Sequence, residues 1–272
     1  MSTLHVLENP APPAGEAGPI SLGGASLPPL LRQVLSEGQA FLPEGGRVPL
    51  HSNVSREEAE LLYRAVRHLR PARSLEVGFA QGISTLAILQ ALEDNAAGQH
   101  HVIDPFQHRF QNVGLAMAGR AGLAHRLEFH HCYAEEAIPA LPPLQFAFID
   151  SSHLFDLTMA EFVLADKKLE VGGMIGFHDL WMPSLQKLVR YLLVNRSYEV
   201  VRLFDPPDGG GRRPFRRTVK RWLRNWPRLM PGAARLFRDE ICRPWFAITE
   251  SNLVLLRKTA EDRRDWQFHQ AF

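Results

Sequence analysis

The stretch that decides the fold is Arg73–Ala91, which reads RSLEVGFAQGISTLAILQA. Its first residues, Ser74–Val77, form a short apolar run with the length and β-branching of a buried strand. Gly78 and Gly82 follow in a tight turn, and Ile83–Ala91 is apolar at helical spacing. A strand, a turn and a helix start in this order bring free backbone N–H groups and the positive end of a helix dipole to one point. We therefore expect this turn to bind the carboxylate or phosphate end of a nucleotide-like ligand.

An acidic residue marks the end of the next predicted strand. His101–Ile103 is followed by Asp104, which lies 22 positions after Gly82. In open parallel sheets, an acid at the tip of the second strand binds the ribose hydroxyls of a nucleotide. The glycine spacing is looser than the dinucleotide fingerprint, so an α/β domain without a nucleotide is the alternative. With Glu76 inside the first strand, the pattern resembles the class I S-adenosylmethionine-dependent methyltransferases rather than NAD enzymes.

Strands and helices alternate along the chain at least five times. The predicted helices are Leu30–Phe41, Ser55–Leu69, Ile83–Ala91, Asn112–Ala121, Ala134–Leu141, Phe155–Leu169 and Ser184–Val194. The predicted strands are Ser74–Val77, His101–Ile103, Leu127–His131, Gln145–Ile149, Met174–Phe177, Tyr198–Phe204 and one within Phe246–Leu256. The alternation predicts an α/β, Rossmann-like, doubly wound and mostly parallel sheet with helices on both faces. The resemblance implies seven strands, with the last one antiparallel beside the sixth.

The length of 272 residues and the hydrophobic fraction of 45% suit one sizeable domain with appendages. Residues 1–29 are rich in Pro, Gly and Ala, so we expect a disordered lead-in before a domain over 30–272. No apolar run reaches the ~18 residues that a membrane span requires. The chain opens without a signal-peptide pattern, and its two cysteines form no disulfide framework. These observations predict a cytoplasmic protein.

Three further stretches resemble a narrower family. They are Glu135–Leu141 (EEAIPAL), Phe148–Asp156 (FIDSSHLFD) and Gly172–Asp179 (GGMIGFHD). Together they are similar to the small O-methyltransferases that include macrocin O-methyltransferase and cephalosporin hydroxylase-type proteins. The resemblance covers about residues 55–205 and Phe246–Lys258, and it implies transfer of a methyl group from S-adenosylmethionine to a hydroxyl.

The resemblance also implies which residues bind the cofactor. Those expected at its methionine end are Glu76, Gly78, Ala80, Gly82 and Ser84. Those expected at its ribose and adenine are Asp104, Pro105, Phe106, Tyr133 and Ala134, and Asp150 is a further expected cofactor-binding residue. Tyr133 stands where relatives usually have an acid, which favours stacking over a hydrogen bond.

Asp150, His178 and Asp179 match the positions where metal-dependent relatives bind a divalent cation. Two carboxylates with open water positions suit Mg²⁺, whereas a histidine among them tolerates Mn²⁺ or Zn²⁺. A metal-independent reaction is the alternative. His153 is the first candidate for the base that removes the hydroxyl proton, since a histidine titrates near neutral pH. His178 is the second candidate, and a purely orienting role for His153 stays open.

Residues 206–244 hold eleven Arg and Lys against three Asp and Glu, a local charge of +8 in a chain of net charge +2. Within 212–226, apolar residues recur at helical spacing opposite a basic face: Phe215, Val219, Trp222, Leu223 and Trp226. We favour a lid or dimer contact over the substrate site for this basic insertion. Contact with an anionic membrane surface or with an acidic substrate is the alternative, and no reader motif points to nucleic acid.

The sequence thus predicts an S-adenosylmethionine-dependent O-methyltransferase for a small-molecule or glycan acceptor, with homo-oligomer formation left open. The alternative is a catalytically silent, cofactor-binding scaffold that docks a membrane or a protein partner through the basic insertion.

Overall fold

The computed structural model describes residues 27–201, 252–268, 270 and 272. Its centre is a seven-stranded sheet in the order β5-β4-β3-β6-β7-β9-β8. Strand β9 runs antiparallel to the other six strands, which all point in one direction. This arrangement confirms the predicted Rossmann-like sheet, with its last strand antiparallel beside the sixth. The strands are β3 (Arg73–Val77), β4 (Gln99–Ile103), β5 (Leu127–His130), β6 (Leu144–Ile149), β7 (Leu169–Phe177), β8 (Tyr198–Val200) and β9 (Val254–Lys258).

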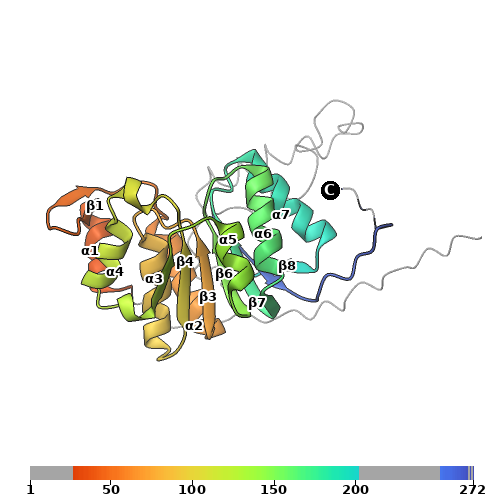
Figure 1. The fold of residues 1–272 in the computed structure, drawn as a ribbon, viewed down its shortest axis with the longest axis horizontal. Coiled ribbons are helices and arrows are strands. Elements are labelled where there is room, and N and C mark those ends of the chain that lie inside the picture. The colour runs from red at the N-terminus through yellow and green to blue at the C-terminus, as the bar shows by residue number, and fades with distance from the viewer. Residues whose placement is uncertain (1–26, 202–251, 269, 271) are drawn as a thin grey trace, which may run out of the picture.

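Helices cover both faces of the sheet (Figure 1). They are α1 (Pro29–Glu37), α2 (Arg56–Leu69), α3 (Ile83–Asp94), α4 (Val113–Arg120), α5 (Ala134–Ala137), α6 (Phe155–Asp166) and α7 (Pro183–Asn195), with short 3₁₀ turns at Gln107–Phe110, Ala124–Arg126 and Ile138–Ala140. Helices α1 to α4 pack with Phe146 and Phe148 of β6, whereas α5 to α7 pack with Ala147 and Ile149 of the same strand. Successive strand residues point to opposite faces, so β6 contributes to both cores.

A capping box starts α2, as the sequence predicts. The Ser55 hydroxyl accepts a hydrogen bond from the Glu58 backbone N–H at 3.2 Å, and the Glu58 carboxylate accepts one from the Ser55 N–H at 2.7 Å. Both bonds satisfy N–H groups that a helix start otherwise leaves unpaired. They also fix the position of the Glu58 side chain, whose carboxylate lies beside His178.

Gly78 shows why the turn after β3 needs glycine. Its φ is +96°, and a Cβ atom at this position would lie 2.1 Å from the carbonyl oxygen of Asp150. The absence of a side chain therefore allows the turn after β3 to approach the end of β6 directly.

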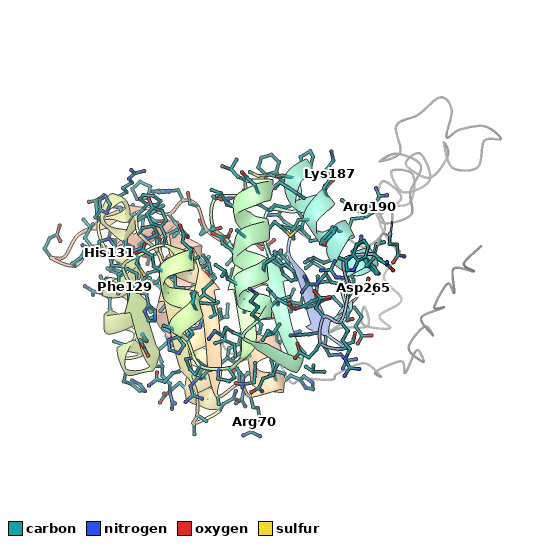
Figure 2. The ribbon with its side chains drawn as sticks, turned by 45° about the vertical axis from the view of Figure 1, so that its right-hand side comes forward. Arg70, Phe129, His131, Lys187, Arg190 and Asp265 are labelled. Atoms are coloured by element: carbon teal, nitrogen blue, oxygen red, sulfur yellow. The ribbon has the colours of Figure 1, made fainter. Side chains whose placement is uncertain are left out.

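Strand β5 forms one edge of the sheet and β8 the other. Figure 2 shows Phe129 and His131 at the β5 edge and Arg190 with Asp265 toward the opposite end. The Phe129 ring packs against Phe79 of the glycine turn with 5.6 Å between centroids. The edge strand is thereby tied to the turn.

The prediction of a helix over 30–41 is wrong about where the helix ends. Helix α1 stops at Glu37 because Gly38 adopts the left-handed conformation that ends helices (φ 65°). The residues after it form β1 (Gln39–Phe41), which pairs with β2 (Arg47–Pro49) in a separate two-stranded sheet.

The helix predicted over 155–169 is also too long. It ends at Asp166, and Leu169 begins β7 by pairing with Leu144 of β6. Gly172 and Gly173 therefore lie inside the strand rather than in the predicted exit turn, and a register shift between β6 and β7 accommodates them.

The predicted disordered lead-in up to residue 26, the basic insertion over 206–244 and the end of the strand predicted over 198–204 lie outside the described residues. Among the described residues, no helix combines the length and apolar character needed to cross a membrane.

Candidate active site

Most of the predicted site residues lie on or after four neighbouring strands that end at the same level. The last residues of these strands are register partners: Ile103, Val77, Ile149 and Phe177. The residues that follow are therefore neighbours at one edge of the sheet: Asp104, Gly78, Asp150 and His178. This edge, at the carboxyl ends of the strands, is where open α/β sheets bind their ligands.

Asp104 holds the glycine turn in place. Its Oδ2 accepts hydrogen bonds from the backbone N–H groups of Phe79 (3.0 Å) and Ala80 (3.2 Å). Its Oδ1 accepts one from the N–H of Phe106 at 2.6 Å, and the side chain is 5% exposed. Each carboxylate oxygen has two lone pairs, so Oδ1 can accept one further hydrogen bond. Its predicted contact with ribose stays a prediction.

Glu76 of β3 and Ser84 of α3 are both buried, and Ser84 donates a hydrogen bond to Glu76. The Glu76 carboxylate also accepts a hydrogen bond from Thr85 at 2.6 Å and lies 3.0 Å from His100 Nε2. These contacts fasten the first turn of α3 to β3. Both side chains therefore help to position the turn, whose N–H groups at Gly78 and Gly82 donate to the carbonyl oxygens of Ile103 and Phe79.

Aromatic side chains flank the turn on the β4–β5 side. Phe106 and Tyr133 meet edge to face with 5.9 Å between ring centroids, and Tyr133 is 49% exposed. The His131 ring lies 3.0 Å from the carbonyl oxygen of Pro105, and Ala134 is buried behind it. An exposed aromatic ring at this position is available for stacking on a flat ligand.

Two aspartates and a histidine converge beside the turn. His153 Nε2 lies 2.6 Å from Asp179 Oδ2 and 3.2 Å from Asp150 Oδ1. The three possible ligand atoms lie within 4.8 Å of one another. His153 and Asp179 both have left-handed backbone conformations, with φ of 61° and 54°. Such conformations cost free energy in non-glycine residues and gather at functional sites.

His178 lies on the other side of Asp150 and faces helix α2. Its Nδ1 is 3.2 Å from Asp150 Oδ1, and its Nε2 is 3.3 Å from Glu58 Oε2. Burial alone would lower the pKa of His178, but the hydrogen bonds with Asp150 and Glu58 outweigh it and raise the pKa to about 10. Burial would likewise raise the pKa of Asp150, yet the neighbouring His153 and His178 rings lower it to about 2. The two neighbouring carboxylates thus favour the imidazolium form of His178.

The cluster of Asp150, His153 and Asp179 differs from the predicted metal set by one histidine. His178 Nδ1 also lies near both carboxylates, at 3.2 Å from Asp150 Oδ1 and 3.7 Å from Asp179 Oδ1. The roles of His178 as a metal ligand and as the base stay predictions.

Sequence reasoning missed three residues of this network: Glu58, Asn252 and Trp181. Glu58 is recognisable only as part of a capping box, although the same carboxylate reaches His178. Asn252 precedes β9, and its side-chain amide donates a hydrogen bond to Asp179 Oδ1 at 3.1 Å. Trp181 Nε1 donates to the same oxygen at 2.9 Å. These two donors fix the Asp179 carboxylate.

The sheet order, the glycine turn and the strand-end acids define the fold as that of a class I methyltransferase. In agreement, residues 75–180 match the family described as "Methyltransferase domain". A caffeoyl-CoA O-methyltransferase of Petunia hybrida is 30% identical over 158 residues, which are 50% of this chain and 61% of that protein. A homologue of Nicotiana tabacum is 29% identical over 158 residues, or 62% of its length. The chain thus matches about three fifths of these relatives.

Solved structures share the fold. A methyltransferase of Podospora anserina with SAH bound has a TM-score of 0.52 at 16% identity and covers 67% of this chain and 87% of its own. An O-methyltransferase of Bacillus cereus in complex with SAH has a TM-score of 0.50 at 20% identity, over 63% and 80% of the two chains. Together these comparisons confirm the predicted resemblance to class I S-adenosylmethionine-dependent O-methyltransferases.

Proposed function

We propose that the protein transfers a methyl group from S-adenosylmethionine to a hydroxyl group of a small molecule. The observation that carries this proposal is the Asp150–His153–Asp179 cluster, which lies directly beside the glycine turn at the ligand edge of the sheet. The likeness to caffeoyl-CoA O-methyltransferases over half of the chain supports the hydroxyl as acceptor. A glycan acceptor is the second possibility within the same chemistry.

The cofactor site would use the turn Gly78–Gly82, whose backbone is held by Asp104. S-adenosylmethionine, when bound, supplies an electrophilic methyl group. The start of α3 after this turn would face its carboxylate, Asp104 Oδ1 is available to a ribose hydroxyl, and Tyr133 can lie against its adenine. Because Gly78 lies against the end of β6, a cofactor bound in this way would lie next to Asp150.

The residues present also fit a divalent cation. Asp150, His153 and Asp179 offer two carboxylate oxygens and one imidazole nitrogen, a donor set that suits Mn²⁺ or Zn²⁺ better than Mg²⁺. A cation held there would lower the pKa of the acceptor hydroxyl and orient it.

Without a cation, His153 is the group placed to take the proton. Its contact with Asp150 outweighs burial and raises the pKa of the ring, which makes the neutral imidazole a stronger base. His178 and Glu58 act behind it: the charge of the imidazolium keeps Asp150 ionised, and Asp150 in turn orients His153. Holding the hydroxyl in line with the methyl group supplies the rest of the acceleration.

The acceptor side of the site is apolar. Leu154, Phe155 and Trp181 lie next in sequence to the cluster and are 57%, 38% and 66% exposed. Exposed large apolar side chains beside a polar centre fit an acceptor with an aromatic or aliphatic body. A cytoplasmic location, oligomer formation and a lid or membrane role for the basic insertion stay predictions.

The test is methyl transfer by the full chain, followed as SAH release with a panel of hydroxylated phenols and sugars, with and without EDTA. We expect turnover with at least one acceptor and a loss of a hundredfold or more in His153→Ala and Asp179→Asn. Turnover that these two variants retain in full would overturn the assignment of the cluster. The measurement in EDTA distinguishes His153 as a metal ligand from His153 as the base. If His153 acts as a metal-independent base, the enzyme keeps its activity in EDTA.

A further inference from the structure

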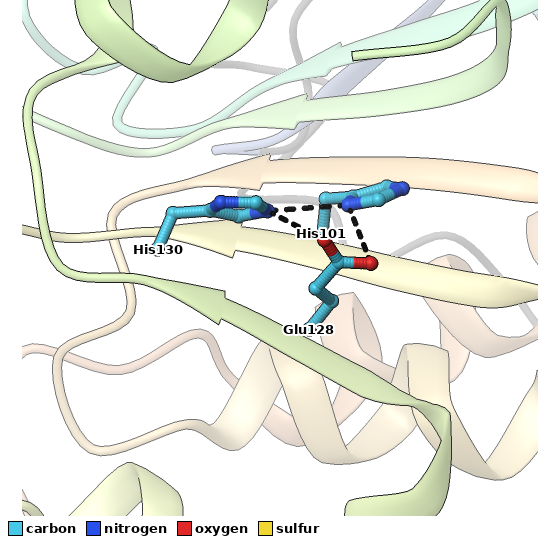
Figure 3. A group of neighbouring side chains, drawn as sticks. All are labelled: His101, Glu128 and His130. Carbon is cyan, nitrogen blue, oxygen red and sulfur yellow. Dashed lines mark hydrogen bonds and ion pairs between the residues drawn. The ribbon is translucent and has the colours of Figure 1, made fainter. Parts of the chain in front are cut away.

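A second group of metal-binding side chains lies away from the proposed active site, on strands β4 and β5. It consists of His101, Glu128 and His130 (Figure 3). His101 is the register partner of Glu128, and His130 follows Glu128 by two positions. All three side chains therefore stand on the same face of the sheet. Strands β4 and β5 are two and three strands away from β6, so the group lies roughly 10–14 Å from β6 at the usual strand spacing.

The three side chains point toward one another with distances typical of metal ligands. His101 Nδ1 lies 3.2 Å from His130 Nε2 and 3.4 Å from Glu128 Oε2. His130 Nε2 lies 3.7 Å from Glu128 Oε1. In a tetrahedral zinc site with bonds of about 2.0–2.1 Å, ligand atoms are about 3.3–3.4 Å apart. The group thus has nearly the ligand spacing of such a site.

The burial of the three side chains also fits a metal site, which must hold its ligands in place and still admit an ion. The side chain of His101 is 6% exposed, that of His130 22% and that of Glu128 57%. The inner ligand is fixed by the sheet, while the outer side is open for entry of an ion and for a water molecule in a fourth position.

We propose that His101, Glu128 and His130 bind a divalent transition metal ion of the zinc type. Two imidazoles and one carboxylate favour Zn²⁺ over Mg²⁺ or Ca²⁺, which prefer oxygen ligands. Because the ligands come from two adjacent strands, the bound ion cross-links the edge strand β5 to β4. It stabilises the folded state by mass action, with a rise in Tm of roughly 5–10 °C when free zinc is a hundredfold above its Kd.

The test is a zinc titration of the full chain by calorimetry, with cobalt absorption as a second readout. The Asp179→Asn background removes a ligand of the other cluster. Glu128→Gln and His130→Ala each remove one proposed ligand, and Glu128→Gln changes only an exposed side chain. His125→Ala is the matched control, because His125 forms an exposed contact with Glu93 at 2.9 Å and is no part of the group.

We expect one equivalent of zinc and a tetrahedral cobalt spectrum in the Asp179→Asn background and in its His125→Ala variant. In the Glu128→Gln and His130→Ala variants, we expect zinc to bind with a Kd at least tenfold weaker. We also expect the tetrahedral cobalt spectrum and the zinc-dependent rise in Tm to be lost in these variants. Absence of zinc binding in the background, or an unchanged stoichiometry in both ligand variants, would overturn the proposal. An equal loss in His125→Ala would assign the binding to scattered surface histidines and overturn it as well.

Discussion

Glu161 of helix α6 makes the stability of the protein depend on pH. Burial raises the pKa of this carboxyl to about 7, against the hydrogen bond from Ser151 that favours its ionised form. The unfolded chain loses the proton near the ordinary value of 4.5. The folded state therefore binds the proton more tightly, so the stabilisation is complete below about pH 4 and is lost as the pH rises through 7.

The size of this pH-dependent stabilisation follows from the difference between the folded and unfolded pKa of Glu161. A difference of about 2.5 pKa units corresponds to about 3 kcal/mol between pH 4 and pH 8, which is an upper bound because the group is only partly shielded from water. Glu161→Gln keeps the shape and removes the titration. We expect the free energy of unfolding of this variant to exceed that of the unchanged protein at pH 8, and the difference to shrink toward pH 4.

Urea unfolding at several pH values measures the free energy of unfolding of the Glu161→Gln variant and of the unchanged protein. Glu44→Gln is the control, since Glu44 is exposed and this variant is expected to follow the pH profile of the unchanged protein. If the pH profiles of the Glu161→Gln variant and the unchanged protein run parallel from pH 4 to pH 8, the buried carboxyl does not titrate as described.

Substitutions of Gly78, in the turn after β3, and of Glu58, which contacts His178, give two further predictions. Gly78→Ala should cost roughly 3 kcal/mol or more in thermal unfolding, since its Cβ would meet the Asp150 carbonyl. Gly119→Ala in α4, with nothing within 4 Å, should gain up to about 1 kcal/mol, and a similar cost at both positions would contradict this. Glu58→Gln should lower the pKa of His178 from about 10 toward its ordinary value, as followed by NMR of the ring; an unchanged pKa would remove Glu58 from the network.

The fold was largely predictable because its main signals are local. The strand, turn and helix of 73–91 are encoded by neighbouring residues, and so is the capping box of α2. The β1–β2 ribbon was missed because its short strands are specified by pairing across a turn rather than by periodicity. The start of β7 at Leu169 was missed for a similar reason, since only its partner Leu144 distinguishes a strand from the last turn of a helix.

The site was predictable as far as it consists of residues that follow parallel strands. Asp104, Asp150 and Asp179 lie along one edge of the sheet because the strand ends share one level. The contact of His178 with Glu58 joins positions 120 residues apart, and no spacing in the sequence indicates it. His101 and Glu128 meet only through the pairing of β4 with β5, so the sequence alone shows two ordinary strand residues.

The central claim is that this sheet edge binds S-adenosylmethionine through the glycine turn and Asp104. Calorimetric titration of the full chain with S-adenosylmethionine tests it most directly, with Asp104→Asn beside it. We expect saturable one-to-one binding that weakens at least tenfold in the variant. Absence of binding in the unchanged protein, or equal affinity in both, would contradict the account.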